Sequence, residues 1–177
     1  MSTPLTFYVK GLPTPQGSKS AWVNPKTGRA VIIDGGSTDT QRKHKAWRKA
    51  VHVAAGAALA EDPLWSPNDP VKVSLAFRLP AYSDGLRTLH ATRPDLDKLV
   101  RSVLDSLTSG GLLTDDGRVA EVHAVKRYAD EEDSETGCLV ILRSLAAEEA
   151  AYRAERKRLR RRGSLPSRRE SGIVPEQ

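Results

Sequence analysis

Acidic side chains gather around one short segment of the chain, residues 93–116. Asp95 and Asp97 stand at the start of an expected helix, and Asp115 and Asp116 follow just after its end. Carboxylate oxygens are the ligands that Mg²⁺ prefers, and carboxylates from separate elements can hold such an ion against a phosphate. The pattern therefore predicts a site for metal-dependent phosphodiester chemistry, with Mg²⁺ as the expected ion and Mn²⁺ as the alternative.

A helix must position these carboxylates. Between them, apolar residues recur at spacings of three and four, the period of a helix with one buried face. We expect the stripe to be buried; it comprises Leu96, Leu99, Val100, Val103, Leu104 and Leu107. The other side of the helix carries Asp97, Arg101 and Asp105 in a row, and Gly110 and Gly111 end the helix.

Each carboxylate also has an ordinary structural explanation. Asp95 suits a helix N-cap, Asp97 suits an ion pair with Arg101 one turn later, and residues 115–117 suit a turn. All three ordinary explanations would have to hold together to leave no site, and these residues lie where the helix and the following turn could approach one another. A cation there would stabilise charge on a phosphate, and Arg101 is better placed for this than Lys98.

Strands and a second helix surround this segment. Residues 71–79 alternate between apolar and polar side chains, which predicts a half-buried strand. Further strands are expected at 5–10, 119–128 and 138–143, and a hairpin or ordered loop around 24–28. A long helix, capped by Thr38 or Asp39 and with a narrow alanine-rich face, should run to about Ala60. These elements predict an α/β (α+β) layer of helices packed on a mixed sheet.

Charge divides the chain into two parts. Residues 146–177 carry nine basic and five acidic residues, which is +4 of the formal net charge of +6. We therefore expect a domain at 1–145 and a basic tail at 146–177, helix-prone at first and disordered towards its end. The domain at 1–145 has almost equal numbers of basic and acidic residues, and its acidic side chains gather around one motif. Its surface can still approach a polyanion.

Several classes of protein are disfavoured by what the sequence lacks. The histidines are scattered without zinc-ligand spacing, and there is no P-loop, nucleophile elbow or dinucleotide fingerprint. The single cysteine, Cys138, excludes an internal disulfide framework and is expected to be a small buried hydrophobe. No apolar run reaches the length of a membrane span, and no signal-peptide pattern opens the chain, so we expect a cytoplasmic protein without membrane partners.

The segment RPDLDKLVRSVLDSLTSGGLLTDDGRVAEVHAVKRY resembles the central signature of the RusA-type Holliday junction resolvases, a family often encoded by phages and prophages. The resemblance covers roughly residues 70–143, and the segment KGLPTPQGSK is compatible with the family's first strand and loop. It implies a RusA-like, homodimeric, Mg²⁺-dependent endodeoxyribonuclease. Such an enzyme cuts four-way DNA junctions by paired nicks in recombination and repair.

Carried over residue by residue, the resemblance makes Asp95, Asp97 and Asp116 the metal-binding catalytic carboxylates. Arg101 stands where the family has its catalytic lysine, so it keeps the charge but cannot donate a proton at ordinary pH. Lys98 replaces a usual asparagine. The expected DNA contacts are made by Lys19, Lys98, Lys126 and Arg127.

The sequence leaves two alternative functions open. One is a nuclease for other branched or flap DNA. The other is a non-catalytic protein that binds branched DNA, in which the basic tail supplies affinity and the acidic cluster is structural.

Overall fold

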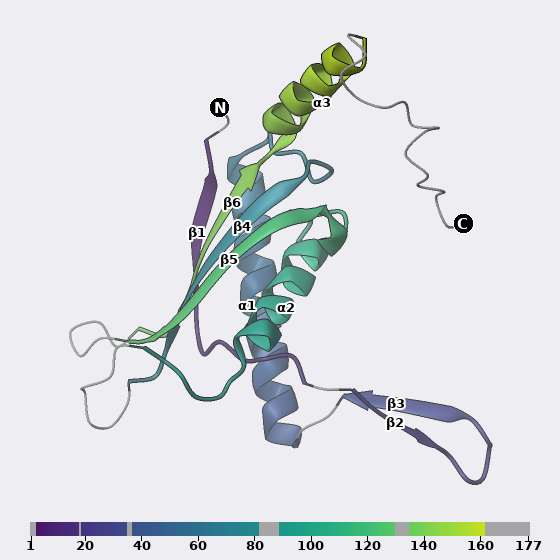
Figure 1. The fold of residues 1–177 in the computed structure, drawn as a ribbon. Helices are drawn as coiled ribbons and strands as arrows, with labels where there is room; N and C mark the ends of the chain where they lie inside the picture. The colour runs from purple at the N-terminus through teal and green to yellow at the C-terminus, as the bar shows by residue number, and fades with distance from the viewer. Residues whose placement is uncertain (1–2, 18, 35–36, 82–88, 130–134, 162–177) are drawn as a thin grey trace.

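The computed structural model describes residues 3–17, 19–34, 37–81, 89–129 and 135–161; the side chains of residues 19, 20 and 32–34 also lie outside that description. Figure 1 shows the elements in space. The strands are β1 (Leu5–Lys10), β2 (Lys19–Val23), β3 (Ala30–Asp34), β4 (Val71–Leu79), β5 (Val119–Tyr128) and β6 (Gly137–Ser144). The helices are α1 (Thr38–Glu61), α2 (Leu96–Ser109), the 3₁₀ turn η1 (Asp116–Arg118) and α3 (Ala146–Arg161).

Four strands form the main sheet, in the order β1-β6-β4-β5. The β1–β6 and β6–β4 pairs are antiparallel, whereas β4 and β5 run parallel. A parallel pair needs a crossover connection, and α2 lies in the connection between these two strands. The mixed sheet with packed helices confirms the predicted fold class. Strands β2 and β3 pair with each other in a separate hairpin, which projects from the body in Figure 1.

The core lies on one face of the sheet. The predicted alternation in β4 is confirmed, because every second side chain is buried, from Val71 to Leu79. The register places Cys138, Val140 and Leu142 of β6 beside these residues, and all three are buried. Burial raises the pKa of the Cys138 thiol, as expected for a cysteine that acts as a small hydrophobe.

Helix α1 crosses this core (Figure 1) and buries Trp47, Val51, Ala55 and Ala58. Its N-cap is Ser37, one residue before Thr38 and two before Asp39, the two expected caps; the Ser37 hydroxyl accepts a hydrogen bond from the Thr40 N–H at 3.3 Å. The predicted cap was wrong by one or two residues because several neighbouring polar side chains can cap a helix. Asp39 instead pairs with Arg42 and Lys43 within the first turns.

The buried face of helix α2 differs from the one that the expected apolar stripe defines. Leu99, Val103 and Leu107 are fully buried, but so are Ser102 and Ser106, whereas Leu96, Val100 and Leu104 are only half-buried. The physical reason is close packing against α1: a Cβ added at Gly110 would lie 2.7 Å from the Ala55 Cβ. Small side chains therefore fill the seam between the helices, and one edge of the apolar stripe faces outward.

Helix α3 stands away from the core. It covers most of the predicted helical run, and none of its residues is buried. The segment 162–177, expected to be disordered at its end, lies outside the described residues. No helix in the described part of the chain is long and apolar enough to cross a membrane.

Candidate active site

The start of α2 carries the first two predicted site residues. Asp95 is the N-cap by backbone position, but its carboxylate makes no capping hydrogen bond. It pairs instead with Lys98, whose Nζ lies 3.1 Å from Asp95 Oδ2. Asp97 follows in the first turn and is exposed. The capping explanation for the Asp95 side chain is thus wrong, because that carboxylate turns towards a lysine one turn later.

The two members of the second acidic pair have different roles. Asp115 caps the short η1 turn, and its carboxylate accepts a hydrogen bond from the Gly117 N–H at 2.8 Å. Asp116 begins η1 and is exposed. Asp115 therefore shapes the turn, which leaves the Asp116 carboxylate on the surface beside α2.

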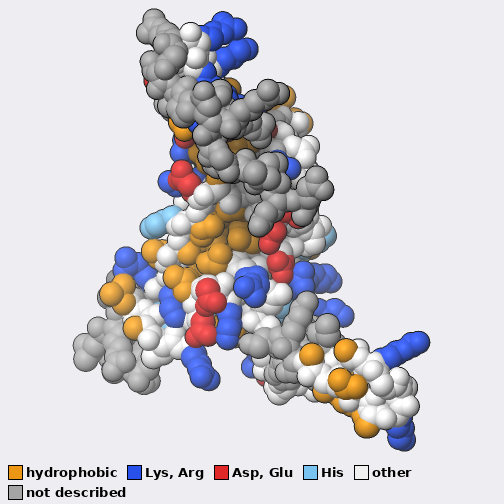
Figure 2. Space-filling model, turned by 45° about the vertical axis from the view of Figure 1, so that its right-hand side comes forward, with side chains coloured by type: hydrophobic (Ala, Val, Ile, Leu, Met, Phe, Trp, Pro, Cys, Tyr) orange, Lys and Arg blue, Asp and Glu red, His pale blue; other side chains and the backbone are white. Residues whose placement is uncertain are grey.

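A shallow hollow of about 520 Å³ brings the charged residues together. Asp97 and Arg101 enter it from α2, and Asp116 enters it from η1. Its remaining wall is apolar and consists of Leu96, Val100, Leu104, Val122 and Ala124. Figure 2 shows this character from the α2 side of the molecule, with hydrophobic side chains gathered at the centre of the face and acidic and basic side chains next to them. The half-buried apolar residues of α2 thus form one wall of the candidate site.

The three expected metal ligands are only partly assembled. Asp97 and Asp116 line one hollow, whereas Asp95 is not among its lining residues. Among the described residues, no group of three or more acidic, histidine or cysteine side chains is close enough to hold a metal ion. The donors present are nevertheless exposed carboxylates, which suit a hard divalent cation that keeps several waters. The chemistry of these residues fits such an ion, since Asp97 and Asp116 present carboxylates to one hollow and Asp95 stands at the start of the same helix.

Lys126 has a partner that sequence reasoning missed. Its Nζ donates to the backbone carbonyls of Thr92 and Pro94, at 2.6 and 2.7 Å. These carbonyls immediately precede Asp95, so Lys126 ties β5 to the loop that leads into α2. The only sequence signal was its alternation with Val122 and Ala124, which places Lys126 on the helix-covered face of the sheet.

The other predicted DNA contacts lie apart from one another. Arg127 pairs with Arg78 in the register and faces the opposite side of the sheet from Lys126, where it lines a separate pocket with Tyr8 and Leu139. Lys98 lies next to Asp97 and is half-exposed. Lys19 begins β2, and its side chain lies outside the described residues.

One histidine next to this loop lies inside the protein. His90 is buried, and its ring centroid lies 4.4 Å from that of Tyr128. Burial lowers the pKa of His90, and the nearby Lys126 charge lowers it further. A neutral, stacked His90 packs the same loop that Lys126 holds.

The segment that contains this site matches a known protein family. The family model for Endodeoxyribonuclease RusA matches residues 18–135, which is more than half of the chain and includes every residue that lines the hollow. The chain therefore belongs to the RusA endodeoxyribonuclease family. Membership confirms the resemblance and implies an enzyme that hydrolyses DNA at Holliday junctions. No curated protein matches the chain.

Proposed function

We propose that this protein is a Mg²⁺-dependent, structure-specific endonuclease that resolves four-way DNA junctions by paired nicks. The observation that carries the proposal is the hollow in which Asp97, Asp116 and Arg101 lie together, in a chain of the RusA family. The proposal includes Mn²⁺ as a substitute ion and a role in recombination and repair in the cytoplasm of a bacterial or phage-infected cell.

In this proposal Asp97 and Asp116 hold the ion, and Asp95 contributes from the start of the helix. A bound divalent cation supplies an activated water and stabilises negative charge on the leaving oxygen. Both lining carboxylates are exposed, so a phosphate of the DNA backbone can reach them.

Arg101 provides the positive charge for the reacting phosphate. It is exposed, shares the hollow with both carboxylates, and forms no ion pair with an acidic side chain in the described part of the chain. A guanidinium can donate two hydrogen bonds to phosphate oxygens, but it stays charged at any ordinary pH. We therefore assign Arg101 to binding and charge stabilisation of the phosphate, and not to proton transfer.

Paired nicking requires two active sites on one junction. A dimer with two-fold symmetry presents two equal sites and matches the symmetry of a four-way junction. The proposal therefore includes a homodimer, which rests on this argument and on the family resemblance.

The test uses labelled DNA substrates with the purified full-length protein. We expect cleavage of a four-way junction with Mg²⁺, no cleavage in EDTA, and little cleavage of a linear duplex of the same sequence. Equal cleavage of a flap substrate would favour the broader branched-DNA nuclease. Binding of the junction without cleavage in Mg²⁺ or Mn²⁺ would favour the non-catalytic DNA-binding protein.

A further inference from the structure

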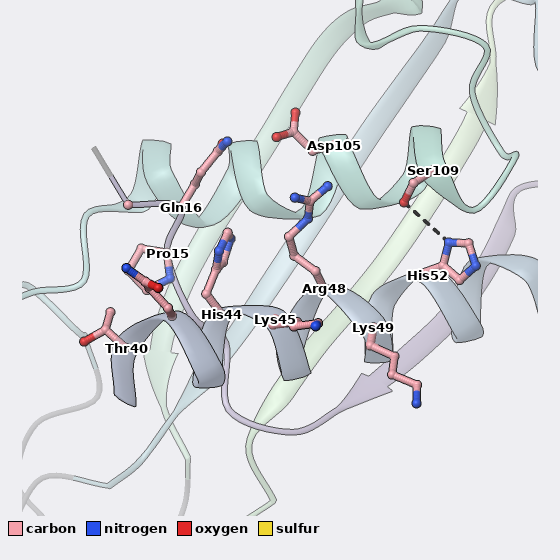
Figure 3. Close-up of a pocket in the computed structure, with 12 residues that line it drawn as sticks. Pro15, Gln16, Thr40, His44, Lys45, Arg48, Lys49, His52, Asp105 and Ser109 are labelled. Atoms are coloured by element: carbon pink, nitrogen blue, oxygen red, sulfur yellow. Dashed lines mark hydrogen bonds between the residues drawn. The ribbon is translucent and has the colours of Figure 1, made fainter. Parts of the chain in front are cut away.

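A second polar surface lies on the other side of α2, where this helix meets α1. It is a groove of about 770 Å³, lined by α1 residues from Thr40 to His52, by Asp105 and Ser109 of α2, and by residues 15–17. Figure 3 shows Arg48 pointing from α1 towards α2, near Asp105. None of these residues belongs to the hollow that holds Asp97 and Asp116.

The groove is basic. Lys45, Arg48 and Lys49 line it, against one carboxylate, Asp105. Lys45 and Lys49 are exposed, Arg48 is half-buried, and none of the three forms an ion pair in the described part of the chain. The neighbouring Arg42 and Lys43 differ in this respect, because Asp39 neutralises both at distances of 2.8 and 2.7 Å. The cations of the groove therefore remain available to an external anion.

Hydrogen-bonding groups accompany the charges along the groove. His52 Nδ1 lies 3.4 Å from the Ser109 hydroxyl, which links the two helices at one end (Figure 3). At the other end, the buried Gln16 Oε1 has no hydrogen-bond partner in the described structure. The Gln16 N–H donates to the Lys98 carbonyl at 3.1 Å, so this end of the groove is attached to α2 directly beside Asp97.

The shape of the groove favours a polymeric anion over a single small one. Its lining on α1 runs from Thr40 to His52, which is about 18 Å along the helix axis. Lys45 and Lys49 are one turn apart, about 6 Å, so the positive charge is spread along the groove and not focused on one point. The lining contains no phenylalanine, tyrosine or tryptophan on which a base could stack. These features suit the sugar-phosphate backbone of DNA more than its bases.

We propose that the α1–α2 groove binds a phosphodiester backbone of the junction, so that α2 separates a DNA-binding groove from the cleavage site. This inference rests on the proposed function and deepens it. Helix α2 contributes Asp97 and Arg101 to the hollow and Asp105 and Ser109 to the groove. A strand held in the groove would therefore keep the junction in a fixed position relative to the hollow.

The test measures junction binding without metal. The Arg48→Ala/Lys49→Ala double variant removes two cations from the groove, and Arg42→Ala serves as the matched control, because it removes an ion-paired arginine from the same helix. Binding to a four-way junction is measured in EDTA across a salt series, and a thermal melt verifies folding of each variant. Removing one cation that neutralises a phosphate should lower the slope of log K against log[salt] by about 0.9.

We expect the double variant to bind the junction about tenfold more weakly or worse at low salt and to flatten the salt slope by nearly two. The loss should be equal for two junctions of unrelated sequence. Cleavage should show a larger rise in KM than fall in kcat. The Arg42→Ala control should bind like the wild type.

Three results would overturn the groove assignment. They are unchanged affinity and slope in the double variant, an equal loss in Arg42→Ala, or a loss confined to one junction sequence. If the wild type cleaves the junction while the double variant binds it normally, the groove proposal fails and the proposed function stands. If the wild type neither binds nor cleaves the junction, both fail.

Discussion

At the level of single residues, the two members of the acidic pair at 115–116 have different surroundings. The Asp115 carboxylate is occupied by the Gly117 N–H, while Asp116 lines the hollow with Asp97. Two adjacent identical residues should therefore respond differently to the same substitution.

We predict that Asp97→Asn or Asp116→Asn abolishes cleavage and leaves junction binding intact, because each change removes charge from the metal site without removing a cation that contacts phosphate. Asp115→Asn is the matched control, since an asparagine oxygen can still accept the Gly117 hydrogen bond. Cleavage rates at saturating Mg²⁺ and affinities in EDTA are the measurements. Near-normal cleavage by either of the first two variants would contradict the site assignment.

The contribution of Arg101 to cleavage should depend on its positive charge and not on proton transfer. We expect Arg101→Ala to lower the cleavage rate by about 10²- to 10³-fold, the scale of losing one group that stabilises transition-state charge. Arg101→Lys should retain most of the activity. Single-turnover rates compare the two variants, and a full rate in the alanine variant would mean that another cation serves the phosphate.

Two roles for Lys126 can be tested against each other: contact with DNA, and support of the loop before α2. Because its ammonium group holds the Thr92 and Pro94 carbonyls, we expect Lys126→Met to lower the stability by about 1.5–3 kcal/mol and to slow cleavage more than it weakens junction binding. Chemical denaturation, rates and affinities separate the roles. A normal free energy of unfolding with weakened binding would instead favour a direct DNA contact.

At the level of elements, α3 differs from α1 and α2 because it buries no side chain. Its contacts with the body are local, such as the ion pair of Glu148 with Arg143. Among the described residues, the last buried one along the chain is Leu145, whose N–H donates to the Pro70 carbonyl at 2.8 Å. The boundary between domain and tail is therefore proposed at Leu145.

We predict that truncation after Leu145 leaves the melting temperature and the cleavage pattern unchanged. It should weaken DNA binding at low salt and flatten the salt slope, because residues 153–169 carry nine basic residues and one acidic one. Salt-dependent binding of the truncated and full chains provides the comparison. An unchanged slope would show that the tail does not contact DNA, and loss of folding would show that it belongs to the core.

At the level of the whole molecule, the described part of the chain brings Asp97, Asp116 and Arg101 together in one hollow, whereas paired nicking requires two active sites. We predict a stable dimer at micromolar concentration, near twice the 19.3 kDa mass of the chain. Sedimentation with and without junction DNA provides the measurement. A 19.3 kDa species under both conditions would contradict the dimer and require two independent monomers on each junction.

Local periodicity was sufficient to predict most elements of this protein. The alternation of residues 71–79 and the three-and-four spacing after Asp95 predicted β4 and α2 closely, because both patterns depend only on backbone repeat. Of the residues that the acidic motif singled out, Asp97, Arg101 and Asp116 line the hollow and Asp95 does not; Asp97 and Arg101 meet there because they share one helix face. Membership of the RusA family was equally visible in the motif.

Only the tertiary structure decided how these elements face one another. The close seam between α1 and α2 buries Ser102 and Ser106 and turns Val100 and Leu104 towards the hollow, a rotation that depends on the partner helix and not on α2 alone. The fold brings Lys126 of β5 to the loop before Asp95, where its side chain holds two backbone carbonyls. The basic groove likewise exists only because two helices distant in the sequence pack side by side.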